Sequence, residues 1–284
     1  ENYTRSLWIA EGWTSYYDNV FLVRAGLITP DEYLGFLEHE YNDIMRFTGR
    51  FRQALRESSY DTWIKFYKKD ENSNNTQISY YTKGALVAAL LNIEIMTSTD
   101  CRKSLDDVMK QLYKDYLENP ATGYTEERVK EIAEAVCGKS LSGFWKKYLD
   151  GTDEIPIRQY LSRCGIAVKD INEHASCSLD AETKADGGRL MITKLFEGGS
   201  GFAAGLCSGD EIIAIDVYRV DEELMKKILS GKKKGDEINV LTARKGMTKL
   251  IKVILKAPLP KFRLSLKTAT SPKESKLLDK WLRG

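Results

Sequence analysis

The spacing of apolar residues changes once along this chain, near Gly165, and that change limits the fold more than any other feature. Before it, apolar residues recur at the spacing of helices, and a nearly continuous apolar helix is expected from about Tyr80 to Thr97. After it, segments such as Arg189–Leu195 have the two-residue period and β-branched content of strands. The sequence therefore predicts an α+β protein with two domains, an all-α helical bundle followed by a β-rich domain.

Local signals place the individual elements. Thr29 begins a capping box with Pro30 at the first helical position, Ser104 and Thr125 should cap two later helices, and Gly138 should end the second of these. We expect the helical bundle at residues 1–160, the β-rich domain at residues 161–257, and a tail at residues 258–284 that packs back on the body. The 284 residues suffice for two domains of ordinary size, each with its own core.

Composition excludes several kinds of partner. Lys and Arg number 43 against 41 Asp and Glu, so the net charge of +2 gives no sign of nucleic-acid binding. No apolar run approaches the roughly 20 residues that span a bilayer, so we expect no membrane segment in this chain. The five Cys are an odd number without a C-x-x-C pair, which favours free thiols. The cellular location stays open between cytoplasm and periplasm.

One acidic residue, Glu11, stands alone in the aromatic stretch from Leu7 to Tyr17. The spacing of Trp8, Glu11 and Ser15 places one residue per turn on a single helical face. A carboxylate on a mostly buried helix needs a counter-charge or a metal ion, whereas the ordinary alternative is a solvated Glu on the helix surface. Glu11 is therefore a candidate metal ligand.

The residues around Glu11, LWIAEGWTSYY at 7–17, resemble the helix that supplies the third zinc ligand in the glycyl aminopeptidase family of zinc metallopeptidases. YYTKGAL at 80–86 and SLDDVM at 104–109 are similar to further segments of that family, in the same order. The resemblance implies that Glu11 binds zinc and that the helical bundle is the C-terminal part of a thermolysin-like catalytic domain. It also implies the removal of small N-terminal residues, Gly or Ala, from a peptide or protein substrate.

The same resemblance points to a second catalytic residue. In related aminopeptidases a Tyr just before a Lys-Gly pair donates a hydrogen bond to the developing oxyanion, and Tyr81 has this place, with Tyr80 as the alternative. A neutral phenol suits that role. The other interpretation of Tyr81 is an aromatic core residue at a helix start. Lys83 is expected to hold a neighbouring carboxylate.

The zinc site is incomplete in this sequence, because the family takes two His ligands and a general base from an H-E-x-x-H motif. His39 opens a similar run but has Asp43 in place of the second His, and it follows Glu11 instead of preceding it. We expect a solvated His39 and an isolated His174. The simplest explanation is that this is the C-terminal part of a longer protein, with zinc bound in the full-length protein and with this part alone inactive.

The β-rich region resembles a PDZ domain in the permuted form of bacterial proteases. Residues 198–210 carry its pattern of a short helix with Ala-Gly-Leu before Gly-Asp and a strand. The resemblance implies a groove helix at Asp221–Leu229 and a loop whose backbone N–H groups bind the carboxylate of a C-terminal peptide. That loop would be formed by Cys164, Gly165, Ile166 and Ala167. Two hypotheses remain open: part of a zinc aminopeptidase, or a non-catalytic peptide-binding scaffold in which Glu11 is a relic and the PDZ fold can be a structural cap.

Overall fold

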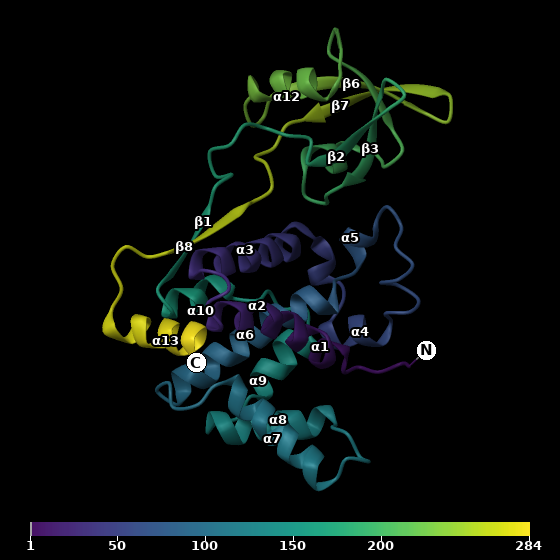
Figure 1. Ribbon diagram of the computed structural model, residues 1–284. Helices are drawn as coiled ribbons and strands as arrows, with labels where there is room; N and C mark the ends of the chain where they lie inside the picture. Colours follow the sequence, from purple (N-terminus) through teal and green to yellow (C-terminus); the bar gives the residue numbers. More distant parts are fainter. Residues whose placement is uncertain (1) are drawn as a thin grey trace.

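The computed structural model describes residues 2–284 and consists of a helical domain and a β-sheet domain joined by a two-stranded ribbon (Figure 1). This arrangement confirms the predicted fold class. The helical domain contains α1 (Leu7–Ala10), α2 (Gly12–Arg24), α3 (Pro30–Arg46), the 3₁₀ turn η1 (Thr48–Phe51), α4 (Leu55–Tyr60), α5 (Ser73–Thr76), α6 (Tyr80–Ser98), α7 (Leu105–Glu118), α8 (Glu126–Cys137), α9 (Ser142–Trp145), the π-helical turn η2 (Lys146–Asp150), α10 (Ile157–Arg163) and α13 (Pro272–Arg283).

Helix α6 lies at the centre of the helical domain. Its residues Leu86 to Leu91 are all at most 1% exposed, and α1, α2, α3, α4, α8, α10 and α13 contact it. A helix that is apolar on every side must be surrounded in this way. Within residues 2–284, no helix is both long and apolar enough to cross a membrane.

The predicted helix ends are confirmed by their hydrogen bonds. The Thr29 hydroxyl accepts from the backbone N–H of Glu32, and the Glu32 carboxylate accepts in turn from the N–H of Thr29. Ser104 forms the same kind of capping box, Thr125 caps α8, and Gly138 ends it in a left-handed conformation with φ of 73°. The stretch between η1 and α6 contains the short helices α4 and α5.

The sheet domain is an antiparallel sheet with one long helix against it. The sheet has the order β2-β3-β4-β6-β7, with β5 paired to β4. Its elements are β2 (Ala181–Asp186), β3 (Arg189–Leu195), α11 (Ser200–Ala204), β4 (Glu211–Ile215), β5 (Tyr218–Arg219), α12 (Glu222–Ser230), β6 (Glu237–Arg244) and β7 (Met247–Ile254). Helix α12 lies where the groove helix was expected, and the arrangement is PDZ-like.

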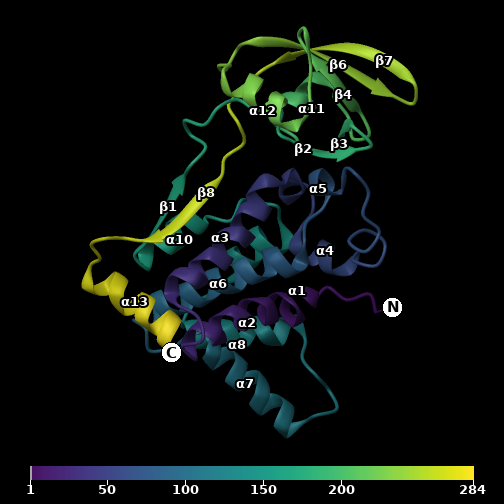
Figure 2. The same ribbon diagram turned by 45° about the horizontal axis from the view of Figure 1, so that its top comes forward.

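Two strands form the connection between the domains. β1 (Ile166–Asp170) and β8 (Phe262–Leu266) pair antiparallel in a separate ribbon, as Figure 2 shows. The apolar side chains of Ile166, Phe262 and Leu264 belong to the core of the helical domain, since β8 packs on α3 and β1 on α10. Helix α13 then packs on α2 and α6 with Trp281 fully buried. In the fold, the sheet domain is therefore an insertion within the helical domain.

A second contact holds the domains together on the far side from the ribbon. The buried Asn75 amide donates to the backbone oxygen of Leu195 at 3.1 Å, and its side-chain oxygen accepts from the N–H of Glu197 at 3.1 Å. Glu197 also pairs with Arg52 at 2.6 Å, and the Phe196 ring stacks on Phe47. The sheet domain is thus attached at two places.

Candidate active site

Glu11 lies at the junction of α1 and α2, where it ends one helix and begins the next. The carboxylate is partly exposed and makes no hydrogen bond or ion pair with another described residue. A half-exposed carboxylate without a partner is available to a ligand. Burial was part of the reason for singling out Glu11, and the structure shows less of it than expected.

The backbone of Glu11 is fixed by a close crossing of two helices. Gly12 and Gly84 face each other between α2 and α6, and a Cβ added at Gly12 would lie 2.7 Å from the Cα of Gly84. Because ordinary contact begins at about 3.4 Å, only glycine fits on both sides. The crossing brings the start of α6, and with it Tyr81, next to the Glu11 junction.

Buried polar contacts fix α1 from the other side. The Trp8 indole N–H donates to the Glu126 carboxylate at 2.7 Å, and the backbone N–H of Trp8 donates to the Ser59 hydroxyl at 3.1 Å. Glu126 is in turn paired with Arg56 at 2.6 Å. Since Trp8 is fully buried and both of its N–H groups are hydrogen-bonded, these contacts fix the position of α1 and of the Glu11 that follows it.

Tyr80 and Tyr81 both begin α6, but their surroundings differ. Tyr80 is 1% exposed, and its hydroxyl lies 3.1 Å from that of Tyr67 in an aromatic cluster. Tyr81 is partly exposed, and its ring packs on Tyr80 at 4.6 Å between centroids. The neighbouring Tyr67 hydroxyl, burial, Tyr80 and the charge of Glu11 all raise the pKa of Tyr81. Tyr81 therefore remains a neutral donor at neutral pH.

The described residues do not complete a metal site. Within residues 2–284 no three His, Cys, Asp or Glu side chains come together as a metal-binding group. His39 projects from α3 with its side chain 78% exposed and faces Asp43 at 3.6 Å, while His174 lies in an exposed loop. Glu11 can supply one oxygen ligand, but a zinc site needs three protein ligands, so this chain alone does not fit zinc.

Lys83 differs from its sequence-based interpretation. Its side chain is 1% exposed, and its ammonium nitrogen has no hydrogen-bond partner among the described residues. No carboxylate of residues 2–284 lies within ion-pair distance of it, contrary to the expectation that it holds one.

The expected carboxylate-binding loop lies outside the sheet domain. Cys164 is fully buried, Ile166 and Ala167 begin the ribbon strand β1, and a Cβ at Gly165 would meet the Thr270 side chain at 2.6 Å. Burial raises the pKa of the Cys164 thiol to about 12. This placement differs from the expected one, since β1 pairs with β8 and not with the PDZ-like sheet. The segment does not reach α12.

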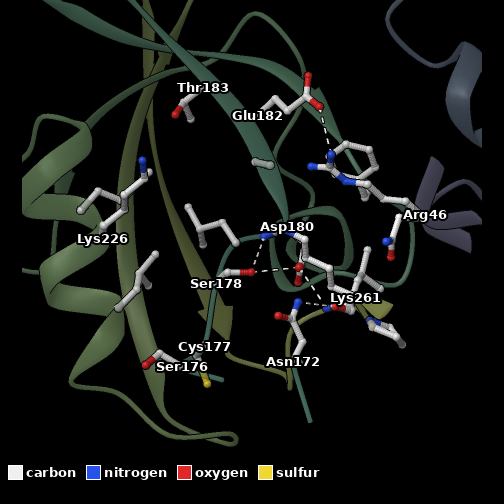
Figure 3. Close-up of a pocket in the computed structure, with 18 of the residues that line it drawn as sticks. Arg46, Asn172, Ser176, Cys177, Ser178, Asp180, Glu182, Thr183, Lys226 and Lys261 are labelled. Atoms are coloured by element: carbon white, nitrogen blue, oxygen red, sulfur yellow. Dashed lines mark hydrogen bonds and ion pairs between the residues drawn. The ribbon is translucent and has the colours of Figure 1, made fainter. Parts of the chain in front are cut away.

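A groove does exist beside α12, built from other residues. Strand β2 pairs only with β3 in the described sheet, so its second edge is free and faces α12. In Figure 3, Lys226 of α12 and Thr183 of β2 face the groove, and Arg46 reaches it from α3 to pair with Glu182 at 3.3 Å. Its volume is about 780 Å³. The helical domain therefore forms one wall of it.

The lower end of this groove is a loop with unused backbone donors. No hydrogen bond is found from the N–H groups of Cys177, Ser178 or Leu179 to any described residue, although Cys177 and Leu179 are less than 9% exposed. Asp180 follows, held by the Ser178 hydroxyl at 2.9 Å. Sequence reasoning missed this loop because it contains no glycine, which is the usual signal of an anion nest.

The fold is a helical domain that carries a PDZ-like domain. Residues 1–87 match the model of the M61 glycyl aminopeptidase family, which confirms the resemblance for this segment. The match covers both Glu11 and Tyr81. A comparison with curated proteins gave no match.

Solved structures extend the comparison over both domains. The chain is similar to an aminopeptidase N family protein from Idiomarina loihiensis with a TM-score of 0.89 and 29% identity, over 99% of this chain and 49% of that one. This chain thus spans about half the length of that protein. Weaker similarity is found to an HtrA-type protease with a decapeptide, at 19% identity, a TM-score of 0.27, and 34% and 31% of the two chains.

Proposed function

We propose that this chain is the C-terminal half of a zinc-dependent aminopeptidase that removes small N-terminal residues, such as Gly or Ala, from peptides. The observation that carries the proposal is the Gly12–Gly84 crossing, which brings together two segments: the junction with the unpaired, partly exposed carboxylate of Glu11 and the start of α6 with the partly exposed phenol of Tyr81. Both residues lie in the segment that matches the peptidase family. The preference for Gly or Ala rests on the family resemblance alone.

In this proposal Glu11 is one zinc ligand, and two imidazoles from residues outside this chain are the others. Zinc, when bound, would polarise the scissile carbonyl and lower the pKa of an attacking water. Glu11 supports that role through its position, since α1, α2 and the Gly12–Gly84 crossing fix its backbone.

Tyr81 has a separate role in the transition state. Its phenol is neutral and remains protonated because its surroundings raise its pKa, so it can donate to a developing oxyanion without first taking up a proton. Tyr80 is less suited, because its side chain is only 1% exposed, whereas that of Tyr81 is partly exposed. We therefore assign the donor to Tyr81.

The test compares three variants of the full-length protein. Glu11→Gln should abolish tight zinc binding, whereas Tyr81→Phe should retain the metal and lower kcat by about a hundred- to a thousand-fold, the usual effect of removing one oxyanion donor. Tyr80→Phe is the matched control, and its kcat should change far less. Zinc content and kcat are measured on the same preparations. Equal loss of zinc in the Glu11 and Tyr81 variants would refute the assignment.

A second function, peptide binding by the PDZ-like domain, is favoured by the free edge of β2 and the unused N–H groups of Cys177, Ser178 and Leu179. A peptide that adds a strand to β2 would lie against α12 with its terminal carboxylate at those donors. This replaces the loop at Cys164 to Ala167 as the carboxylate site. Peptide binding at this site would give the protein a scaffold role, whether or not the full-length protein is also a catalyst.

Peptide binding is tested with labelled peptides that carry a free C-terminus and with the same peptides amidated. The chain should bind the free acid with modest affinity, and amidation should weaken binding at least tenfold, since charge-assisted hydrogen bonds are lost. Equal binding of both forms would refute the proposed carboxylate-binding site. Absence of any binding would leave the domain a packing element.

A further inference from the structure

An apolar groove lies between α2 and α7, separate from the groove beside α12. Its volume is about 750 Å³, and its walls are mostly apolar. Ala10, Thr14 and Phe21 line one wall, and Met109 and Tyr113 of α7 line the other. In Figures 1 and 2, α7 and α8 form a hairpin at the end of the molecule opposite the sheet domain.

Helix α7 has an apolar face that the described residues do not cover. Only Leu105 and Val108 of α7 are buried. Met109, Tyr113 and Leu117 follow one another at intervals of four residues, so they lie on one face of the helix, and all three are exposed. An exposed apolar patch of this kind beside a groove marks an interaction site.

The facing side of α2 is open as well. Phe21 is exposed, and its ring stacks on that of Tyr17 at 5.0 Å between centroids. The Tyr17 hydroxyl donates to the Asp106 carboxylate at 2.9 Å, and Arg24 pairs with the same carboxylate at 2.9 Å. Because this carboxylate is satisfied inside the chain, the groove offers an occupant mainly apolar and aromatic surface, as the core of a protein–protein contact does.

The groove begins beside the candidate zinc ligand. Ala10 and Thr14 line it, and they lie one position before and three positions after Glu11. In the proposed function two imidazoles from outside this chain join Glu11, so the polypeptide that carries them must reach this junction. The similar protein from Idiomarina loihiensis has about half of its chain outside the match, which is enough for a partner of domain size.

We propose that the groove between α2 and α7 is the docking surface for the other half of the full-length protein, which packs an apolar segment against Phe21, Met109 and Tyr113. This inference rests on the proposed function, in which that half carries the imidazole ligands. A second copy of this chain suits the site less well. Its only two His lie on α3 and in an exposed loop, so it cannot bring adjacent imidazoles to Glu11.

The test is hydroxyl-radical footprinting of the full-length protein, with oxidation of single side chains read by mass spectrometry. Tyr113 and Tyr218 are matched probes, because they are 61% and 57% exposed in this structure and Tyr218 lies on β5 of the sheet domain. Each rate is compared with that in the urea-unfolded protein. Folding should slow the oxidation of Tyr113 by about tenfold or more and that of Tyr218 by only about twofold, since the core of an interface excludes water. A Tyr113 that stays as reactive as an exposed tyrosine would overturn the proposal.

A photocrosslink then identifies the occupant. Tyr113→benzoylphenylalanine in the full-length protein should form a link within one polypeptide, to residues that precede this chain. A link to a second molecule, or one confined to residues 1–284, would overturn the proposal. Loss of the Tyr113 protection on about hundredfold dilution would do the same, because protection within one polypeptide does not depend on concentration.

These readouts require neither zinc nor activity, so the two proposals can fail separately. A covered groove in a full-length protein without zinc at Glu11 would refute the proposed function and leave the docking surface. Bound zinc together with a fully reactive Tyr113 would refute the docking surface alone.

Discussion

Replacing Gly84 with Ala should destabilise the protein, although Ala is the better helix former. A Cβ at Gly84 would lie 2.9 Å from the Cα of Gly12 and 2.9 Å from the backbone oxygen of Trp8, where ordinary contact begins at about 3.4 Å. The atoms it meets are backbone and cannot rotate away. Overpacking of this kind costs about 1–3 kcal/mol, and the clash with two backbones favours the upper end. The gain in helix propensity offsets about 0.5–1 kcal/mol, which leaves a net loss of about 2 kcal/mol.

This loss should appear as a Tm lower by about 4–8 °C in far-ultraviolet circular dichroism, given about 2–4 °C per kcal/mol for a domain of this size. Gly35→Ala in α3 is the control, because nothing lies within 4 Å of its added Cβ. That variant should gain about 0.5–1 kcal/mol and unfold at a higher temperature. A Gly84→Ala variant at least as stable as the unmodified protein would refute the account of the helix crossing.

Two further predictions concern the attachments of the sheet domain and of α13. Asn75→Ala should lower the free energy of unfolding by about 1–3 kcal/mol, because it removes the hydrogen bonds to the Leu195 carbonyl and the Glu197 N–H. Calorimetry should show a lower Tm, and an unchanged Tm would contradict the role of this contact. The Lys267 ammonium and the Ser271 cap lower the pKa of Glu274 from 4.5 to about 2, so its contribution is complete above pH 4.5 and is lost as the pH falls toward 2. Trp281 fluorescence should report release of α13 in that window, and Glu274→Gln should lack this pH dependence; identical pH curves for both proteins would contradict it.

The sequence was sufficient for features that depend on local chemistry. Thr29, Ser104 and Thr125 cap helices as predicted, because a cap requires only residues three positions apart. The ribbon was missed because β1 and β8 are about a hundred residues apart, and each becomes a strand only through the other and the core beneath it. Long-range pairing leaves little trace in either segment alone.

The candidate site was predictable in part for the same reason. Glu11 and Tyr81 each stood in a recognisable segment, but their proximity depends on the contact between Gly12 and Gly84, which neither segment announces. The carboxylate loop was placed at Cys164 to Ala167 on the resemblance to a PDZ domain, whereas the unused donors occur in the loop at residues 177–179. The Lys83 ammonium lacks a partner because the side chain is buried, and the local sequence around Lys83 does not predict that burial.

Because the sheet domain is inserted before α13, the order of synthesis differs from the order of packing. The ribosome produces all the remaining helices of the helical domain, and then the whole sheet domain, before it makes residues 272–283. Trp281, Leu277 and Leu282 complete the helical core, so until then the surfaces of α2 and α6 that they cover are open to water. During translation this uncovered apolar surface is where a chaperone, or a wrong partner, would first find the chain.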